Sequence, residues 1–335
     1  LAGTIDSWLL WKLTGGRVHA TDATNASRTL LFDLHRQAWC DELCAMFRVP
    51  RAILPEVRDS AADYGVTAAG LFATPIPIRA LIGDQQAAAI GQDCVAPGQA
   101  KATYGTGCFV LVNTGAAPLV SRHRLLATVA LRLAGRATYA LEGSIFNVGT
   151  VVQWLRDRLG LIPDAAASAE IAASVPSSAG VYCVPAFTGL GAPWWDPDAR
   201  GALVGLTRDS GRAEIVRAAL ESVAFQTRDL ANAFADDGVP LAALRVDGGM
   251  AANDWLMQLL ADQLRIPVER PTVLETTAWG AARLAGLHAG VYPALGAGGL
   301  RRVERTFSAT NARDDGDRLH AGWLRAVGRV RGGAA

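Results

Sequence analysis

The sequence predicts an α/β protein, because segments typical of β-strands alternate with segments typical of helices. Residues 244–247 read as a strand, and apolar residues at helical spacing follow over 255–264. An apolar run over 76–82 leads into Gly83-Asp84-Gln85-Gln86 and then an Ala-rich helix to about Gly91. The sequence therefore predicts a strand, a tight turn and a helix at both places.

The remaining segments fit the same class. β-prone residues 103–104 and 109–112 flank Gly105-Thr106-Gly107, which predicts a β-hairpin. Residues 187–201 are rich in Gly, Pro and Trp and predict a long loop. Apolar periodicity predicts further helices over 4–13, 39–47, 146–161, 214–230, 276–287 and 319–330.

Bulk composition excludes several classes of protein. The 335 residues suffice for two domains with cores of their own. The net charge of +1 gives no signal for a nucleic-acid partner. No apolar run reaches the length that membrane insertion needs. The five cysteines show neither metal nor disulfide spacing, and the first residues do not resemble a signal peptide, which predicts a cytoplasmic protein.

Three glycine-rich turns are the first candidates for chemistry: 83–86, 105–107 and 247–249, each after a β-like run. Glycine lets the backbone approach a ligand closely, and successive N–H groups in such turns bind anions. Any one of these turns, taken alone, is more often an ordinary turn. The P-loop motif, the protein-kinase motifs and the GxGxxG fingerprint are missing, so a phosphate would be bound by another scaffold.

Asp84 is the candidate acid–base residue, because a carboxylate in a turn beside two amides can accept a proton from an alcohol. A capping role at the start of the following helix is an equal alternative. The five histidines are dispersed and read as surface or packing residues. The tryptophans of the 187–201 loop could line a cleft, although packing is the favoured interpretation.

Together these residues resemble the FGGY carbohydrate kinases, and within that family the glycerol kinases. The resemblance runs through nearly the whole chain. Its most specific parts are the 83–86 turn and the 187–201 loop, and it also rests on residues 3–16, 24–29 and 201–221.

The resemblance implies the two-domain fold of the actin-like ATPases (ribonuclease H-like), with the first domain incomplete. Residues 1–92 would be the C-terminal part of the substrate domain, and residues 93–335 the nucleotide-binding domain. We expect an N-terminal segment with a phosphate-binding hairpin to be missing, so that the isolated chain is inactive.

The resemblance also implies roles for single residues. Asp84 would be the general base, and Asp84, Gln85 and Phe109 would bind the substrate. No residue is assigned as a metal ligand. The nucleotide would be contacted by Gly105, Thr106, Gly107, Gly149, Gln153, Gly249 and Asn253.

The implied reaction is ATP-dependent phosphorylation of glycerol to sn-glycerol 3-phosphate, with Mg²⁺ on the phosphate oxygens. The partners would be glycerol and ATP, and a homodimer or homotetramer is a possible assembly. Two alternatives stay open: an FGGY kinase of another polyol or sugar, and a non-catalytic nucleotide-binding module.

Overall fold

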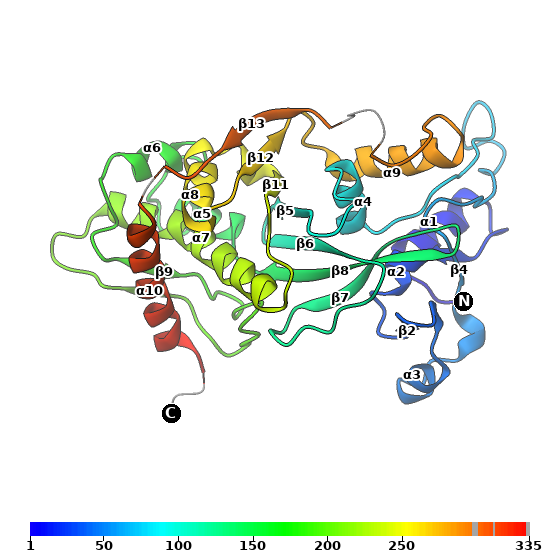
Figure 1. The fold of residues 1–335 in the computed structure, drawn as a ribbon, viewed down its shortest axis with the longest axis horizontal. Helices are drawn as coiled ribbons and strands as arrows, with labels where there is room; N and C mark the ends of the chain where they lie inside the picture. Colours follow the sequence, from blue (N-terminus) through cyan, green and yellow to red (C-terminus); the bar gives the residue numbers. More distant parts are fainter. Residues whose placement is uncertain (297–300, 311, 333–335) are drawn as a thin grey trace.

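The computed structural model describes residues 1–335 except 297–300, 311 and 333–335. Within the described residues the chain forms one large mixed sheet with helices on both faces, and a smaller N-terminal part beside one end of that sheet (Figure 1). This arrangement confirms the predicted α/β class.

The large sheet has seven strands in the described part of the chain, in the order β13-β12-β11-β5-β6-β8-β7. β5, β11 and β12 are parallel, whereas β5, β6, β8 and β7 are successively antiparallel. The carboxyl ends of β5, β8 and β11 therefore lie at one edge. The strands are Ala100–Tyr104 (β5), Cys108–Gly115 (β6), Leu126–Leu133 (β7), Arg136–Ile145 (β8), Leu244–Asp247 (β11), Val268–Pro271 (β12) and Val303–Phe307 (β13).

Different helices cover the two faces of this sheet. The long helix α7 (Arg212–Asp236) and α8 (Asp254–Leu264) pack on the face that carries Val110 and Val112. Leu111 points to the opposite face, because successive strand residues alternate, and packs there with Ala89 of α4 (Asp84–Gly91). Helix α9 (Thr276–His288) packs in turn on α4.

The N-terminal part holds short elements around a core of its own. Phe32 and Trp39 pack there with Val129 of β7 and Tyr139 of β8, which attaches this part to the end of the large sheet. Its elements are α1 (Ile5–Leu13), β1 (Ala20–Asp22), α2 (Ala23–Ala26), β2 (Phe32–Asp33), β3 (Ala38–Trp39), α3 (Asp41–Met46), η1 (Arg51–Ile53) and β4 (Glu56–Arg58).

The remaining elements gather at the other end of the sheet, around the N-terminal half of α7. There Trp323 of α10 is fully buried against Phe225 of α7, and the two rings stack at 5.7 Å. The elements are α5 (Gly149–Asp157), α6 (Ala167–Ala173), β9 (Tyr182–Val184), β10 (Ala202–Val204), η2 (Gly249–Ala252) and α10 (Arg313–Val330). No described helix combines the length and apolarity of a membrane span.

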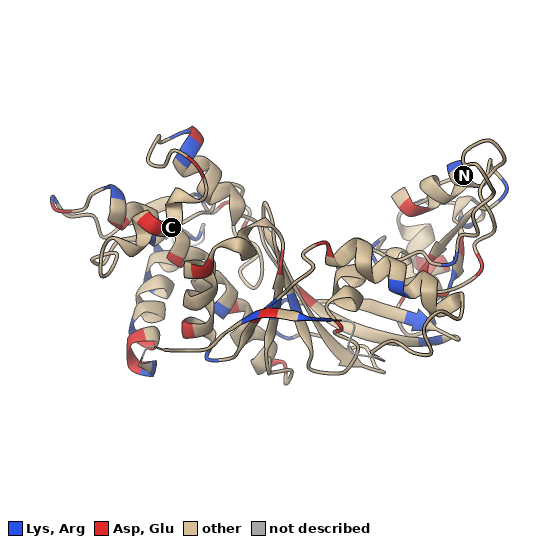
Figure 2. Ribbon diagram, turned by 90° about the horizontal axis from the view of Figure 1, so that it is seen from above, with Lys and Arg blue, Asp and Glu red and all other residues tan. Residues whose placement is uncertain are grey.

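Viewed from above, the two ends stand apart, with the sheet running between them (Figure 2). Acidic and basic residues are interspersed along both ends (Figure 2).

The prediction of a strand over 76–82 is wrong. This segment runs beside residues 60–67 with several backbone hydrogen bonds, but it makes isolated bridges, at Ala61–Ala80 and Val66–Pro77, and no regular strand. Pro75 and Pro77 have no N–H to donate, so a continuous ladder cannot form there. The helix after the turn, the hairpin, the 244–247 strand and the other predicted helices are confirmed, with ends shifted by a few residues.

Helices α4 and α9 pack unusually closely because glycines lie at their contact. A Cβ on Gly280 of α9 would lie 1.8 Å from the carbonyl oxygen of Ala87, and one on Gly91 of α4 would lie 2.0 Å from that of Thr276. The fully buried Arg283 adds a bond of 2.6 Å from Nη1 to the Ile90 carbonyl oxygen and an ion pair with Asp93.

We expect Gly280→Ala to destabilise the fold by about 1–3 kcal/mol, because the new methyl group would overlap rigid backbone. The matched control is Gly328→Ala on α10, where nothing lies within 4 Å of the new Cβ. The control should gain ~0.5–1 kcal/mol from helix propensity. Urea unfolding followed by circular dichroism measures both, and equal stability of the two variants would refute the close contact.

Candidate active site at the carboxyl edge of the sheet

Two of the predicted glycine turns meet at the edge where β5, β8 and β11 end. Gly105-Thr106-Gly107 joins β5 to β6, and Gly149 opens α5 just after β8. Gly248 follows β11 with φ of +86°, and a Cβ there would lie 2.5 Å from the Tyr104 carbonyl oxygen. The carboxyl ends of parallel strands thus place these turns side by side, as ligand sites in α/β sheets require.

The Gly105–Gly107 hairpin is bonded to the first turn of α5. The backbone N–H groups of Val148 and Gly149 donate to the carbonyl oxygens of Thr106 and Gly105, both at 3.0 Å. A Cβ on Gly149 would lie 2.6 Å from the Gly105 carbonyl oxygen. The structure therefore brings Gly105, Thr106, Gly107 and Gly149 together.

Gly249, Asn253 and Gln153 belong to the elements that follow β11 and β8, and in the described structure they make no hydrogen bond to this hairpin. Gly249 opens η2, and the place of a Cβ on it is open space. Asn253 caps α8, since its Oδ1 accepts from the Leu256 N–H at 2.9 Å, which leaves its amide nitrogen as a donor. Gln153 lies exposed on α5, one turn after Gly149.

Asp84 lies in the first turn of α4 with its side chain exposed. The N-cap position belongs to Gly83, but Asp84 Oδ1 does accept the N–H of Gln85 at 2.7 Å. Both interpretations of Asp84 thus keep support: the carboxylate contacts the helix start and also faces solvent.

A buried polar chain from the N-terminal part holds the turn before Asp84. The Gly83 N–H donates to Thr24 Oγ1 at 2.8 Å, and Thr24 Oγ1 donates in turn to the carboxylate of Asp22 at 2.8 Å. Burial raises the pKa of the Asp22 carboxyl, while hydrogen bonds from Ser60, Asn25 and Thr24 oppose that rise. The 24–29 segment singled out in the sequence therefore supports the Asp84 turn.

Phe109 lies on β6, level with Thr103 of β5 and Ser144 of β8, and 39% of it is exposed. Residues paired across a sheet point to the same face, so these three share the face covered by α4. Glu142, two residues before Ser144, forms an ion pair of 2.7 Å with Arg28.

Sequence reasoning missed the charged residues beneath this edge. The fully buried Lys101 donates from Nζ to Gln85 Oε1 and, at 3.0 Å, to Thr103 Oγ1. Asp247 accepts from Thr276 Oγ1 at 2.5 Å and from Gln92 Nε2 at 3.0 Å. One signal was visible in the sequence: Lys101 is one of only two lysines and interrupts a β-prone run.

Comparison with known proteins places this geometry in a family. Residues 1–91 match the N-terminal domain, and residues 100–289 the C-terminal domain, of the FGGY family of carbohydrate kinases. The chain belongs to the FGGY family of carbohydrate kinases.

Relatives within the FGGY family are similar along nearly the whole chain. The glycerol kinase of Rhodospirillum centenum is 59% identical over 99% of this chain, and that of Alcanivorax borkumensis is 58% identical over 98%. The match covers 67% and 66% of those two proteins, so the chain spans about two thirds of their length.

Solved FGGY structures agree in fold. Plasmodium falciparum glycerol kinase with ADP is 37% identical, with a TM-score of 0.91 over 98% of this chain and 66% of its own. A ligand-bound xylulose kinase from Lactobacillus acidophilus, at 22% identity and a TM-score of 0.81 over 97% of this chain and 66% of its own, shows the fold alone. The actin-like architecture of the FGGY kinases is thereby confirmed for this chain.

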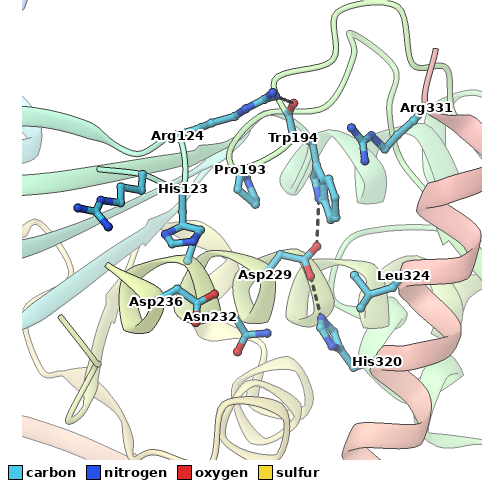
Figure 3. A pocket seen from close by; sticks show the side chains of 12 residues that line it. His123, Arg124, Pro193, Trp194, Asp229, Asn232, Asp236, His320, Leu324 and Arg331 are labelled. Atoms are coloured by element: carbon cyan, nitrogen blue, oxygen red, sulfur yellow. Dashed lines mark hydrogen bonds and ion pairs between the residues drawn. The ribbon is translucent and has the colours of Figure 1, made fainter. Parts of the chain in front are cut away.

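A separate pocket of about 380 Å³ lies between α7, α10 and the 187–201 loop (Figure 3). Asp229 lines it, accepting from Trp194 Nε1 at 3.3 Å and lying 2.7 Å from His320 Nε2 (Figure 3). It also accepts from Trp323 Nε1 at 2.8 Å. Trp194 thus packs, as favoured from the sequence, and also lines a pocket. None of the predicted site residues lines it.

The cysteines contribute thiols that are held away from solvent. None of the five forms a disulfide, and Cys40 alone is not fully buried. Burial raises the pKa of the Cys94 thiol to about 11 and that of Cys183 to about 12. These two thiols therefore stay protonated and unreactive at neutral pH.

We expect a methyl group to destabilise the protein at Gly248 but not at the adjacent Gly249. Gly248→Ala should destabilise the protein by about 1–3 kcal/mol, because of its positive φ and the nearby Tyr104 carbonyl. Gly249→Ala should change stability by less than about 0.5 kcal/mol, since its Cβ meets open space. Thermal unfolding of the pair measures the difference, and a large loss at position 249 would contradict the open space.

Proposed function

We propose that this chain supplies the general base and the nucleotide-binding side of a kinase that transfers the γ-phosphoryl group of ATP to glycerol, giving sn-glycerol 3-phosphate. The carrying observation is that Asp84 has an exposed carboxylate, and that its neighbour Gln85 is bonded to Lys101 on β5, the strand that leads into the Gly105–Gly107 turn. Glycerol is preferred as substrate because the relatives named above are glycerol kinases at 58–59% identity.

The proposal divides the chain at residues 92 and 93. Residues 1–92 would belong to the substrate domain and residues 93–335 to the nucleotide domain. The matches to the two FGGY domains, at 1–91 and 100–289, support this division. Cytoplasmic location and assembly into a homodimer or homotetramer belong to the same proposal.

Phosphoryl transfer requires mainly positioning and charge neutralisation, because its transition state is loose. Asp84 would accept the proton of the attacking hydroxyl, while Gln85 and Phe109 would hold the polyol. Thr106 and the N–H groups of its hairpin would contact the phosphates, and the Gly149 end of α5 would add favourable potential.

The adenosine side of the nucleotide would lie over Gly249 and Asn253, with Gln153 beside it. The open space at the Gly249 Cα supports the first contact, and the amide nitrogen of Asn253, which has no acceptor among the described residues, supports the second. A nucleotide that stretches from this side to the hairpin would point its terminal phosphate toward the α4 side of the edge.

Mg²⁺, carried with the nucleotide, would neutralise charge on the phosphate oxygens. Such Mg²⁺ keeps several waters and needs only one or two protein carboxylates. No cluster of three metal-ligating side chains occurs among the described residues. Asp84 is the exposed carboxylate at this edge that could meet its water shell.

We expect Asp84→Asn to lower kcat by about 10²–10⁴, the usual contribution of a general base. Asparagine retains an oxygen that can accept the Gln85 N–H, so the melting temperature and ADP affinity should stay unchanged. The assay measures glycerol 3-phosphate formation by the complete product of the source gene and, in parallel, by residues 1–335 alone. Undiminished turnover would remove Asp84 from the base role, whereas a lower melting temperature would favour its capping role.

We expect Gly249→Ala to weaken ADP binding about tenfold, because a methyl group would enter the space assigned to the nucleotide. Glycerol affinity should not change. Calorimetric titration with ADP and with glycerol separates the two effects, and Gly328→Ala serves as the control. Unchanged ADP binding would contradict the placement of the nucleotide beside η2.

A further inference from the structure

Lys101 is a cation buried inside the sheet, directly beneath the proposed substrate site. It lies on β5 with 0% of its surface exposed, which is rare for lysine unless the charge is compensated. Burial lowers the pKa of its ammonium group, and the nearby carboxylates of Asp247, Glu142 and Asp84 oppose that effect. These three acids come from β11, β8 and α4, so the charge is balanced from three elements.

The hydrogen bonds of Lys101 connect it to the first turn of α4. Its Nζ donates to Gln85 Oε1 in the first turn of α4 and to Thr103 Oγ1 on its own strand. Gln85 is the residue next to Asp84. The buried ammonium group of Lys101 is therefore connected to the proposed substrate site by one side chain, that of Gln85.

This contact fixes which way the Gln85 amide faces. The orientation of an amide is settled by its hydrogen-bond partners, and an ammonium group has donors but no acceptor. The amide oxygen must therefore face Lys101, and the Nε2 hydrogens face away from it. No acceptor for Nε2 is found within the described part of the chain, and the side chain is partly exposed.

We infer that Lys101 is a positioning residue that locks the Gln85 amide, so that Gln85 donates to the substrate hydroxyl and does not accept from it. This inference rests on the proposed function. A hydroxyl oxygen that accepts from Gln85 Nε2 must direct its own proton to another acceptor, and Asp84 is the neighbouring carboxylate. The lock would thus turn the hydroxyl proton toward the base before phosphoryl transfer.

A double-mutant cycle on the complete gene product tests the lock. Lys101→Met removes the donor at similar volume and should weaken glycerol binding about tenfold, close to the value of one hydrogen bond to a charged group. In a Gln85→Ala background the same substitution should lower glycerol affinity by less than about threefold further, because the side chain through which Lys101 acts is already absent. Lys12→Met, at the other, exposed lysine, is the matched control and should change nothing.

Calorimetric titration with glycerol in the presence of ADP gives the four affinities of this cycle. Independent, additive losses from Lys101→Met and Gln85→Ala would overturn the inference and leave Lys101 as a structural charge. An ADP affinity that is preserved in Lys101→Met shows that the nucleotide side remains intact.

A variant that preserves the buried bond covers the case in which Lys101→Met fails to fold. Gln85→Glu keeps an oxygen for Lys101 but presents an acceptor where the amide presents a donor. It should retain or raise the melting temperature and still lose glycerol affinity by about tenfold or more. Glycerol binding that is unchanged in Gln85→Glu would overturn the inference that residue 85 must donate to the substrate hydroxyl.

A spectroscopic readout separates this inference from the identity of the substrate. The side-chain amide signal of Gln85, assigned by its disappearance in Gln85→Ala, should shift in Lys101→Met without any ligand. An unmoved signal would overturn the lock. A shifted signal in a protein that neither binds nor phosphorylates glycerol would keep the lock and refute the proposed function instead.

Discussion

The close contact between α4 and α9 is the constraint on which the candidate site depends. Backbone carbonyls of one helix lie where a Cβ of the other would be, at Gly91 and Gly280, so the two helices cannot move apart or slide without losing this fit. Asp84 begins α4 and Thr276 begins α9, and the Thr276 hydroxyl bonds to Asp247 at the end of β11. The position of the proposed base relative to the glycine turns is therefore fixed by helix packing, together with the bond that holds the Gly83 N–H on Thr24.

Polar groups reinforce this contact where the two helices meet the sheet. Gln92, just after α4, donates to Asp247 and to the Val246 carbonyl oxygen, and Arg245 binds the carbonyl oxygens of Gln92 and Asp93. Buried polar groups of this kind are costly unless they are satisfied, so together they favour one arrangement of α4 over others.

The sequence predicted those elements that are determined by residues close together along the chain. The Gly105–Gly107 hairpin, the 244–247 strand and the helices that follow glycine turns could be predicted, because turn residues and apolar periodicity act over a few positions. β7 and β8 were missed as a pair, since their long antiparallel contact depends on residues distant in sequence. The strand expected over 76–82 was wrong because apolar composition outweighed Pro75 and Pro77, which deny the segment a ladder.

For the site, the glycine turns and Asp84 could be found from the sequence, but the charges that support them could not. Lys101, Glu142 and Asp247 lie on three different strands, and only the register of the sheet brings their side chains under one edge. Glu142 uses one oxygen for Arg28 and buries the other without a hydrogen bond in the described structure. Arg28 pairs directly with this carboxylate, and Lys101 adds a second positive charge in the same low-dielectric layer. The buried charges therefore support one another, so that removing the ammonium would lower stability through Glu142 and Asp247, separately from its effect on glycerol binding through the Gln85 amide.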